Sequence, residues 1–136
     1  MNDLFCNFGN LSFATVNSQT GLDSFSRLPL GFGIVAADFN LDGYPDLFIA
    51  NGHIWDWELL GDEYEYRMRP QLIANNDGSR FRDVSGTAGE YFQQRYLGRS
   101  VARGDLDADG DMDLVVTHAD RPPATVSYTH LRAPRD

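Results

Sequence analysis

The chain has 136 residues and a formal net charge of −9, which suits one domain or part of one and argues against nucleic acid as a partner. Hydrophobic residues make up 42 % of the sequence, enough for a packed core and too many for a disordered chain. No run of about 18 apolar residues exists, so no membrane span is expected.

Short apolar segments bounded by Gly, Asp and Asn follow one another from the start of the chain. Residues 4–6 and 13–16 predict a first pair of strands. Residues 32–37 and 47–50 predict a second pair, and an acidic loop separates them. Segments this short, partly β-branched, are typical of buried strands and not of helices.

The same order continues in the second half of the chain. Residues 72–74 and 81–84 predict a third pair of strands, joined by the turn Asn76-Asp77-Gly78-Ser79, whose composition favours a β-hairpin. Residues 101–102 and 114–117 predict a fourth pair, again on either side of an acidic loop. The unit is therefore strand, acidic loop, strand, long loop, strand, tight turn, strand.

Aligned with itself, the chain repeats. Asp38 matches Asp105, 67 positions later, and Leu4 matches Leu72, 68 positions later. We predict a complete four-stranded unit over residues 31–90, the second half of a preceding unit over 1–25, and the first half of a following unit over 97–125. Residues 126–136 break the repeat and resemble a translated sequencing adapter, so we expect the biological sequence to stop near residue 125.

The two acidic loops have one pattern, counted from the first Asp. Positions 1, 3, 5 and 9 carry oxygen-bearing side chains, position 6 is Gly, and position 7 is expected to offer its backbone carbonyl. Carboxylates about 4 Å apart repel by about 4 kcal/mol at an effective dielectric constant near 20, so such a loop closes best around a cation. The predicted ligand residues are Asp38, Asn40, Asp42, Tyr44 and Asp46 in the first loop and Asp105, Asp107, Asp109, Asp111 and Asp113 in the second.

The pattern predicts Ca²⁺, because Ca²⁺ accepts about six to eight oxygen ligands in a flexible cage. An EF-hand is excluded: it needs a bidentate Glu at position 12 and flanking helices, whereas Ile49 and Val116 stand there inside predicted strands. We expect two structural Ca²⁺ sites and tighter binding at the second loop, which offers four ligand carboxylates to the three of the first.

On these loops the chain resembles the FG-GAP/VCBS repeats of integrin-α-type β-propellers. Phe32-Gly33 stands at the place of the family's Phe-Gly dipeptide, where the second repeat has Arg99-Ser100. More narrowly, the chain resembles the bacterial relatives of cartilage acidic protein that carry an ASPIC/UnbV domain, although this sequence holds no such domain. The residues behind that resemblance are Asn51-Gly52-His53-Ile54, Gln71-Leu72-Ile73-Ala74-Asn75, Phe81-Arg82-Asp83-Val84 and Gly104-Asp105-Leu106-Asp107.

The resemblance, which covers about residues 3–120, implies an all-β fold: a partial β-propeller with one complete four-stranded antiparallel blade and two half blades. It implies a calcium-stabilised interaction or adhesion scaffold, not an enzyme, in an extracellular, periplasmic or cell-surface location. The implied partners are an unidentified protein or carbohydrate ligand and the remaining blades of a longer chain. Because a fragment of a ring exposes strand edges, we expect the isolated chain to be marginally stable or prone to aggregate.

The loop over residues 54–70 leaves an alternative open, in which the propeller is the scaffold of an extracellular enzyme, for example a carbohydrate-active one. Acidic runs in loops are usually only solvated, and nothing in the sequence fixes the separation of a catalytic pair. The residues concerned are His53, Trp55, Asp56, Trp57, Glu58, Asp62, Glu63, Tyr64, Glu65 and Tyr66. The tripeptide Arg103-Gly104-Asp105 is interpreted as coincidence, because Asp105 is the first predicted metal ligand.

Overall fold

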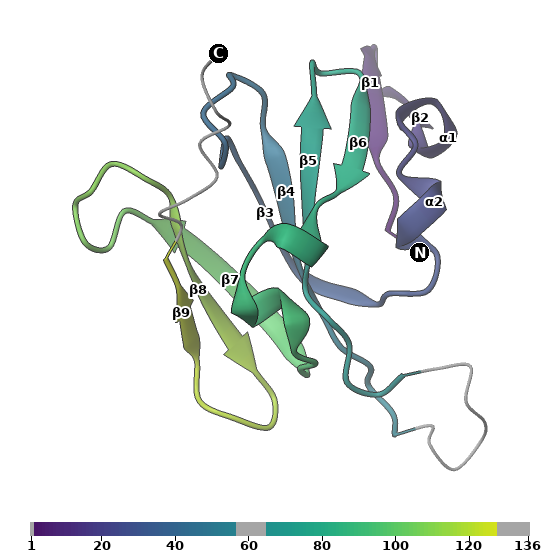
Figure 1. Ribbon diagram of the computed structural model, residues 1–136. Coiled ribbons are helices and arrows are strands. Elements are labelled where there is room, and N and C mark those ends of the chain that lie inside the picture. The colour runs from purple at the N-terminus through teal and green to yellow at the C-terminus, as the bar shows by residue number, and fades with distance from the viewer. Residues whose placement is uncertain (1, 57–64, 128–136) are drawn as a thin grey trace.

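The chain folds into three antiparallel β-sheets in the described residues, 2–56 and 65–127 of a computed structural model (Figure 1). The strands are β1 (Phe5–Gly9), β2 (Ser12–Thr15), β3 (Gly31–Ala37), β4 (Asp46–Asn51), β5 (Gln71–Asn76), β6 (Arg80–Asp83), β7 (Gly98–Gly104), β8 (Asp113–His118) and β9 (Ala124–Val126). The helical segments are α1 (Asn17–Thr20), α2 (Asp23–Ser26), η2 (Ser85–Thr87) and η3 (Glu90–Gln93). The predicted all-β class is confirmed, and the arrangement is consistent with part of a β-propeller.

The central sheet contains four strands in the order β3-β4-β5-β6, each antiparallel to its neighbour along the chain. Its strands lie between Gly31 and Asp83, and the division of the chain into repeat units stays a prediction. Its last two strands are joined by the predicted hairpin turn, in which Asp77 has a φ of 55° and Gly78 a φ of 75°. Positive φ at both central residues is what a type I′ turn requires.

The other two sheets are smaller. The hairpin β1–β2 forms a two-stranded sheet, and all nine of its residues are exposed. The sheet β7-β8-β9 has a third strand that the sequence did not indicate. Val126 pairs with Leu114 and is only 8 % exposed, so the expected boundary near residue 125 falls inside β9. Residues 128–136 lie outside the described part of the chain.

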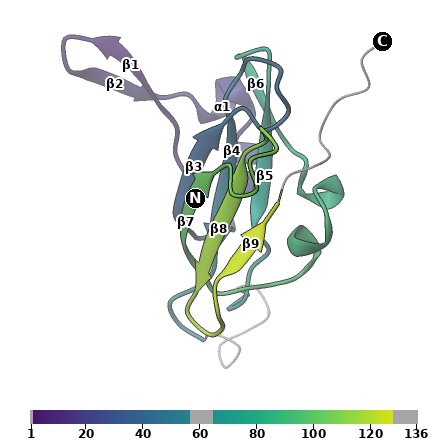
Figure 2. The same cartoon turned by 90° about the vertical axis from the view of Figure 1, so that its left-hand side faces the viewer.

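The main hydrophobic core lies between the central sheet and the sheet β7-β8-β9, which pack face to face (Figure 2). Phe92 of η3 fills the space between the sheets, with its ring edge-on to that of Phe48 at a centroid distance of 5.8 Å. The buried residues of this core are Ala37, Phe39, Phe48, Ala50, Leu72, Phe92, Leu114, Val116 and Val126. Burial of this apolar surface is the main force that holds the two sheets together.

Gly33 permits the close approach of strands β3 and β7. A Cβ atom on Gly33 would lie 2.9 Å from the backbone of Ser100 and Val101, so a larger residue would push the sheets apart. Two arginines of β7 reach across the same junction. The guanidinium of Arg99 lies 4.4 Å from the ring centroid of Phe32, and Nη1 of Arg103 donates to the carbonyl of Ala36 at 2.6 Å.

The opposite face of the central sheet is covered by the N-terminal segment. Leu22 and Phe25 pack on Ile49 and Ile73 in a second, smaller core. The sequence did not indicate α1 and α2, because four residues are too few to show a helical period. None of the helices among the described residues is long and apolar enough to cross a membrane.

Replacement of Gly33 by Ala is expected to destabilise the fold by about 1–3 kcal/mol, because the added methyl group meets backbone atoms and not a flexible side chain. The matched control is Gly86→Ala, since a Cβ atom there would have nothing within 4 Å. Urea unfolding followed by circular dichroism measures the difference. Equal free energies of unfolding for the two variants would contradict the proposed role of Gly33.

Candidate metal centre

The two acidic loops occupy equivalent places in the fold. The first connects β3 to β4 and the second connects β7 to β8, which are the first two strands of their respective sheets (Figure 1). Each loop therefore lies at the end of a hairpin whose strands belong to the main core.

The carboxylates of the first loop fold back onto the loop's own backbone. Asp38 accepts hydrogen bonds from the N–H groups of Asp42 at 3.0 Å and Gly43 at 2.8 Å. Oδ1 of Asn40 also accepts from the N–H of Asp42 at 3.0 Å, and Oδ1 of Asp42 accepts from the N–H of Tyr44 at 2.8 Å. These bonds fix the side chains at positions 1, 3 and 5 in one compact turn.

The second loop repeats this network position by position. Asp105 accepts from the N–H groups of Asp109 and Gly110, both at 3.1 Å. Asp107 accepts from the N–H of Asp109 at 3.3 Å, and Asp109 accepts from that of Asp111 at 2.9 Å. The same residue pattern has thus produced the same local structure twice.

The backbone conformation of the two loops also agrees. Position 6 has a φ of 93° at Gly43 and 92° at Gly110, which confirms the expectation that Gly is needed there. Position 4 is left-handed as well, with a φ of 58° at Leu41 and 60° at Ala108. The sequence did not reveal this second left-handed position, because no Gly or Asn marks it.

The aspartate at position 9 differs from the others because it is buried. Asp46 and Asp113 are each 2 % exposed. Asp46 accepts hydrogen bonds from the N–H of Phe39 at 3.1 Å and from that of Asn75 at 2.8 Å, and Asp113 accepts from the N–H of Leu106 at 2.8 Å. Asp46 therefore connects the first loop to strand β5.

Burial raises the pKa of Asp46 above its ordinary value of 3.8, against the lowering effect of the N–H groups of Asn75 and Phe39. The negative charges of Asp42 and Asp38 raise it further. The ionised carboxylate is thus less well stabilised in the folded chain than in water. A positive ion next to this loop would stabilise the ionised carboxylate and so lower the pKa of Asp46.

A cluster of three carboxylates in the second loop has the dimensions of a cation site. One oxygen each from Asp105, Asp107 and Asp109 can be chosen so that all three lie within 4.8 Å of one another. Two oxygens bound to one Ca²⁺ at about 2.3–2.6 Å lie at most about 5.2 Å apart, so this cluster fits a shared calcium ion. Loss of hydration raises the pKa of Asp107, and the charge of Asp109 raises it further.

The first loop offers a weaker donor set. The amide of Asn40 occupies the position that Asp107 has in the second loop, and its Nδ2 donates to Asp42 at 2.9 Å. Asp46 and Asp113 lie in the buried layer below the loops, and Tyr44 and Asp111 donate their N–H groups to position 5. Coordination of an ion by any of the ten predicted ligand residues stays a prediction.

The loop over residues 54–70 is only partly described. Trp57, Glu58, Asp62, Glu63 and Tyr64 lie outside the described residues. Nδ1 of His53 accepts a hydrogen bond from the N–H of Trp55 at 3.1 Å, and Glu65 forms an ion pair with Arg95 at 2.6 Å. The N–H of His53 donates to the carbonyl of Tyr66 at 2.9 Å, and the enzymatic alternative stays a prediction.

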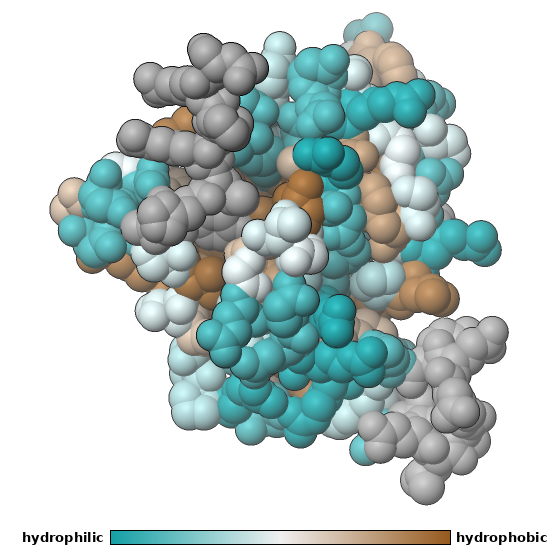
Figure 3. Space-filling view, viewed as in Figure 1, coloured by the Kyte–Doolittle hydropathy of each residue, from teal (hydrophilic) through white to brown (hydrophobic). Residues whose placement is uncertain are grey.

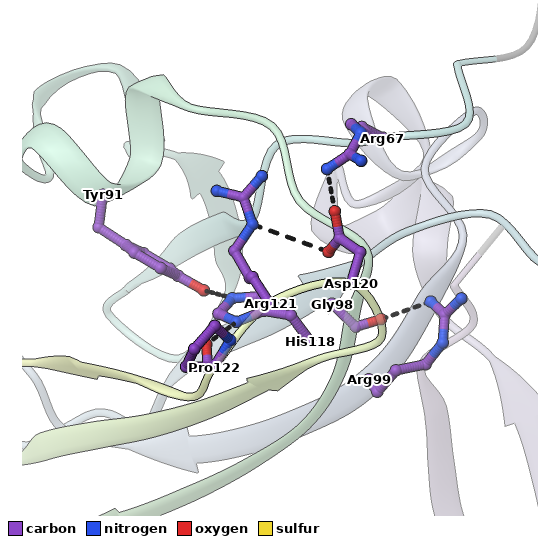
Figure 4. A network of polar contacts seen from close by, with 8 residues as sticks. All are labelled: Arg67, Tyr91, Gly98, Arg99, His118, Asp120, Arg121 and Pro122. Carbon is purple, nitrogen blue, oxygen red and sulfur yellow. Dashed lines mark hydrogen bonds and ion pairs between the residues drawn. The ribbon is translucent and has the colours of Figure 1, made fainter.

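A network of polar and aromatic contacts that the sequence did not reveal lies beside η3 (Figure 4). The hydroxyl of Tyr91 lies 2.9 Å from Nε2 of His118, whose Nδ1 lies 3.1 Å from the carbonyl oxygen of Pro122. The ring of Tyr96, 6 % exposed, stacks on both Tyr91 and His118 at centroid distances of 4.6 and 4.8 Å. Because its central ring is buried, this network fits a structural role.

The network continues as ion pairs between the long loop and the β8–β9 turn. Asp120 pairs with Arg67 and, at 3.7 Å, with Arg121 (Figure 4). The guanidinium of Arg121 lies 4.8 Å from the ring centroid of Tyr96. Burial raises the pKa of the Tyr91 hydroxyl well above its ordinary value, so Tyr91 is a neutral partner of His118.

The chain is distantly similar to a known protein. Over 113 residues the chain is 31 % identical to cartilage acidic protein 1 of Xenopus tropicalis, a match that covers 83 % of this chain and 15 % of that protein. The chain thus spans about a seventh of the length of this relative. No family model matches the sequence. The predicted resemblance is confirmed at the level of this distant similarity, and its assignment to FG-GAP/VCBS repeats stays a prediction.

In the absence of divalent cations, the free energy of unfolding is expected to rise as the pH falls from neutral toward the acidic range in which these aspartates bind protons. The folded-state pKa values of Asp46 and Asp107 are raised, so their contribution to stability is present at low pH and is lost as the pH rises through these values. Urea unfolding in EDTA at several pH values measures the slope. The variant Asp46→Asn should show a shallower slope than the native chain, and an identical slope would contradict the assignment.

Proposed function

We propose that each acidic loop binds one structural Ca²⁺ and that the chain is a calcium-binding repeat module of an FG-GAP/VCBS-type β-propeller. The observation that carries this proposal is the agreement of the two loops, 67 residues apart, in their hydrogen bonds and in both left-handed positions. A surface turn without a ligand has no reason to keep the same oxygen-bearing side chains folded inward twice.

The donor set favours calcium over other metals. All predicted side-chain ligands supply oxygen, which hard cations prefer, and His or Cys ligands of the kind that bind zinc are absent from the loops. Mg²⁺ demands near-ideal octahedral geometry and keeps several of its waters, whereas Ca²⁺ tolerates an irregular cage of carboxylates and carbonyls.

The bound ion would supply positive charge that offsets the repulsion among the carboxylates. The residues of the chain would hold the ion and connect the two ends of each loop. Asp105, Asp107 and Asp109 surround the site, and Asp113 ties the end of the loop to the N–H of Leu106 at the start. In the first loop, Asp46 extends the connection to Asn75 of β5. Ion binding therefore fastens two strands of one sheet and, in the central sheet, a third.

The biological role that follows is an interaction or adhesion scaffold for a protein or carbohydrate partner. Loops of this kind with modest affinity fill only where calcium is abundant, which favours an extracellular, periplasmic or cell-surface location. The distant similarity to a protein named for cartilage, a tissue made largely of extracellular matrix, supports the same location. Neighbouring blades of a longer chain are the nearest partners.

Calorimetric titration with Ca²⁺ is expected to show two sites, with tighter binding at the second loop because it offers one more carboxylate. Asp109→Ala should weaken the tight site by about ten- to a hundredfold, and Asp42→Ala should affect only the weak site. Asp23→Ala, which changes an aspartate of α2, is the control and should leave both sites intact.

Three results of this titration would contradict the proposal. They are the absence of calcium-dependent heat in the native chain, equal losses in the Asp42 and Asp109 variants, and a comparable loss in the control. A calcium concentration about a hundredfold above the dissociation constant should also add about 2.7 kcal/mol per site to the free energy of unfolding, which gives an independent readout.

A further inference from the structure

Strand β5 ends beside the first acidic loop, and it brings a buried asparagine to that point (Figure 1). Asn75 is only 6 % exposed. Residues 76–80, which follow it, are all exposed, and their turn presents hydrophilic residues to solvent near the top of Figure 3. A buried polar side chain next to an exposed turn is expected to have specific partners.

Two donors of Asn75 bind the end of the first loop. Its backbone N–H donates to Oδ1 of Asp46 at 2.8 Å, and its Nδ2 donates to the carbonyl of Pro45 at 3.1 Å. Pro45 and Asp46 are adjacent, and Asp46 is the first residue of β4. Asn75 is therefore attached, through its backbone and its side chain, to the point where the loop enters the sheet.

The oxygen of the same side-chain amide is left over. Oδ1 of Asn75 is buried and has no hydrogen-bond partner among the described residues. The opposite orientation of the amide would set Oδ1 against the Pro45 carbonyl, which cannot donate, so the present orientation is the better one. An unpaired buried acceptor costs about 1–3 kcal/mol. A hydrated cation at the loop would remove that cost.

The first hairpin provides an internal comparison. Asn7 matches Asn75 at a spacing of 68 residues, and the two occupy equivalent places, because Asn7 pairs with Phe13 and Asn75 pairs with Phe81. In the described chain, β1 belongs to a two-stranded sheet that has no acidic loop. There Oδ1 of Asn7 accepts from the N–H of Gly9 at 2.8 Å. Beside the acidic loop, the amide of Asn75 instead turns to the loop.

We propose that Asn75 is a residue of the first calcium site and that its Oδ1 is an oxygen donor to the hydrated ion. This inference rests on the calcium binding proposed above. Ca²⁺ accepts about six to eight oxygens, so a donor from outside the loop suits a site with one amide, Asn40, among its side chains. A neutral oxygen also adds a ligand without adding to the repulsion among Asp38, Asp42 and Asp46.

Calorimetric titration of Ca²⁺ into the whole chain tests this assignment. Asp107→Ala and Asp109→Ala are present throughout, so that only the first site of this parent chain contributes heat. Asn75→Leu has nearly the same shape but no polar side-chain atoms, and it should weaken the first site at least about tenfold. Asn75→Asp keeps an oxygen in place of Oδ1 and adds a charge, so it should bind calcium at least as tightly as the parent.

The matched control is Asn76→Leu, which changes the exposed neighbour and should leave the affinity unchanged. An unchanged affinity in Asn75→Leu, with calcium binding intact in the parent, would overturn this assignment alone. Equal weakening by Asn75→Leu and Asn75→Asp would overturn the donor role, because both variants lack Nδ2 and only one retains an oxygen. A comparable loss in the control would also overturn it. A native chain without calcium-dependent heat would overturn calcium binding itself, and this assignment with it.

Urea unfolding followed by circular dichroism gives a second readout. In EDTA, Asn75→Asp should be less stable than Asn75→Leu, because its carboxylate lies beside that of Asp46. Excess calcium should reverse this order, whereas a purely structural role of Asn75 would give the same order in both conditions and overturn the proposal. An Asn75→Asp chain that is unfolded in EDTA should fold when calcium is added, and its failure to fold would overturn the donor role.

Discussion

The structure depends on how the repulsion among the carboxylates at the ends of its two main hairpins is offset. Asp105, Asp107 and Asp109 bring carboxylate oxygens within 4.8 Å of one another, an arrangement that is costly unless backbone N–H groups or a cation offset the repulsion. The N–H groups of the loops provide part of that offset, and the Ca²⁺ that we propose for each loop would provide the rest. Asp46 and Asp113 are buried between the loops and the sheets. A change in the charge of the loops therefore also affects the packing of the sheets.

A second constraint is the spacing of the sheets. Gly33 brings the backbones of β3 and β7 close together, and residues of both sheets then share one core. The arginines of β7 cover the rim of that core by stacking on Phe32 and donating to Ala36. The acidic loops thus hold together the first two strands of each sheet, while Gly33 sets the distance between the two sheets.

The sequence allowed the prediction of the features that local chemistry determines. The short apolar segments became strands, Asp77 and Gly78 formed the expected hairpin turn, and both loops adopted one backbone path. It did not allow prediction of β9 or of the contacts of Tyr91 and His118. These depend on burial against residues far away in the chain, such as the pairing of Val126 with Leu114. The left-handed conformation of Leu41 and Ala108 was missed because the loop's hydrogen bonds impose it on residues that do not favour it.

Diffraction from crystals grown in millimolar calcium, with data that record the anomalous scattering of calcium, tests the central claim most directly. The account predicts one anomalous peak in each loop, between Asp38 and Asp42 in the first and among Asp105, Asp107 and Asp109 in the second. The stronger peak should be at the second loop. Loops that show no peak at this calcium concentration, with their carboxylates turned toward solvent, would contradict the account.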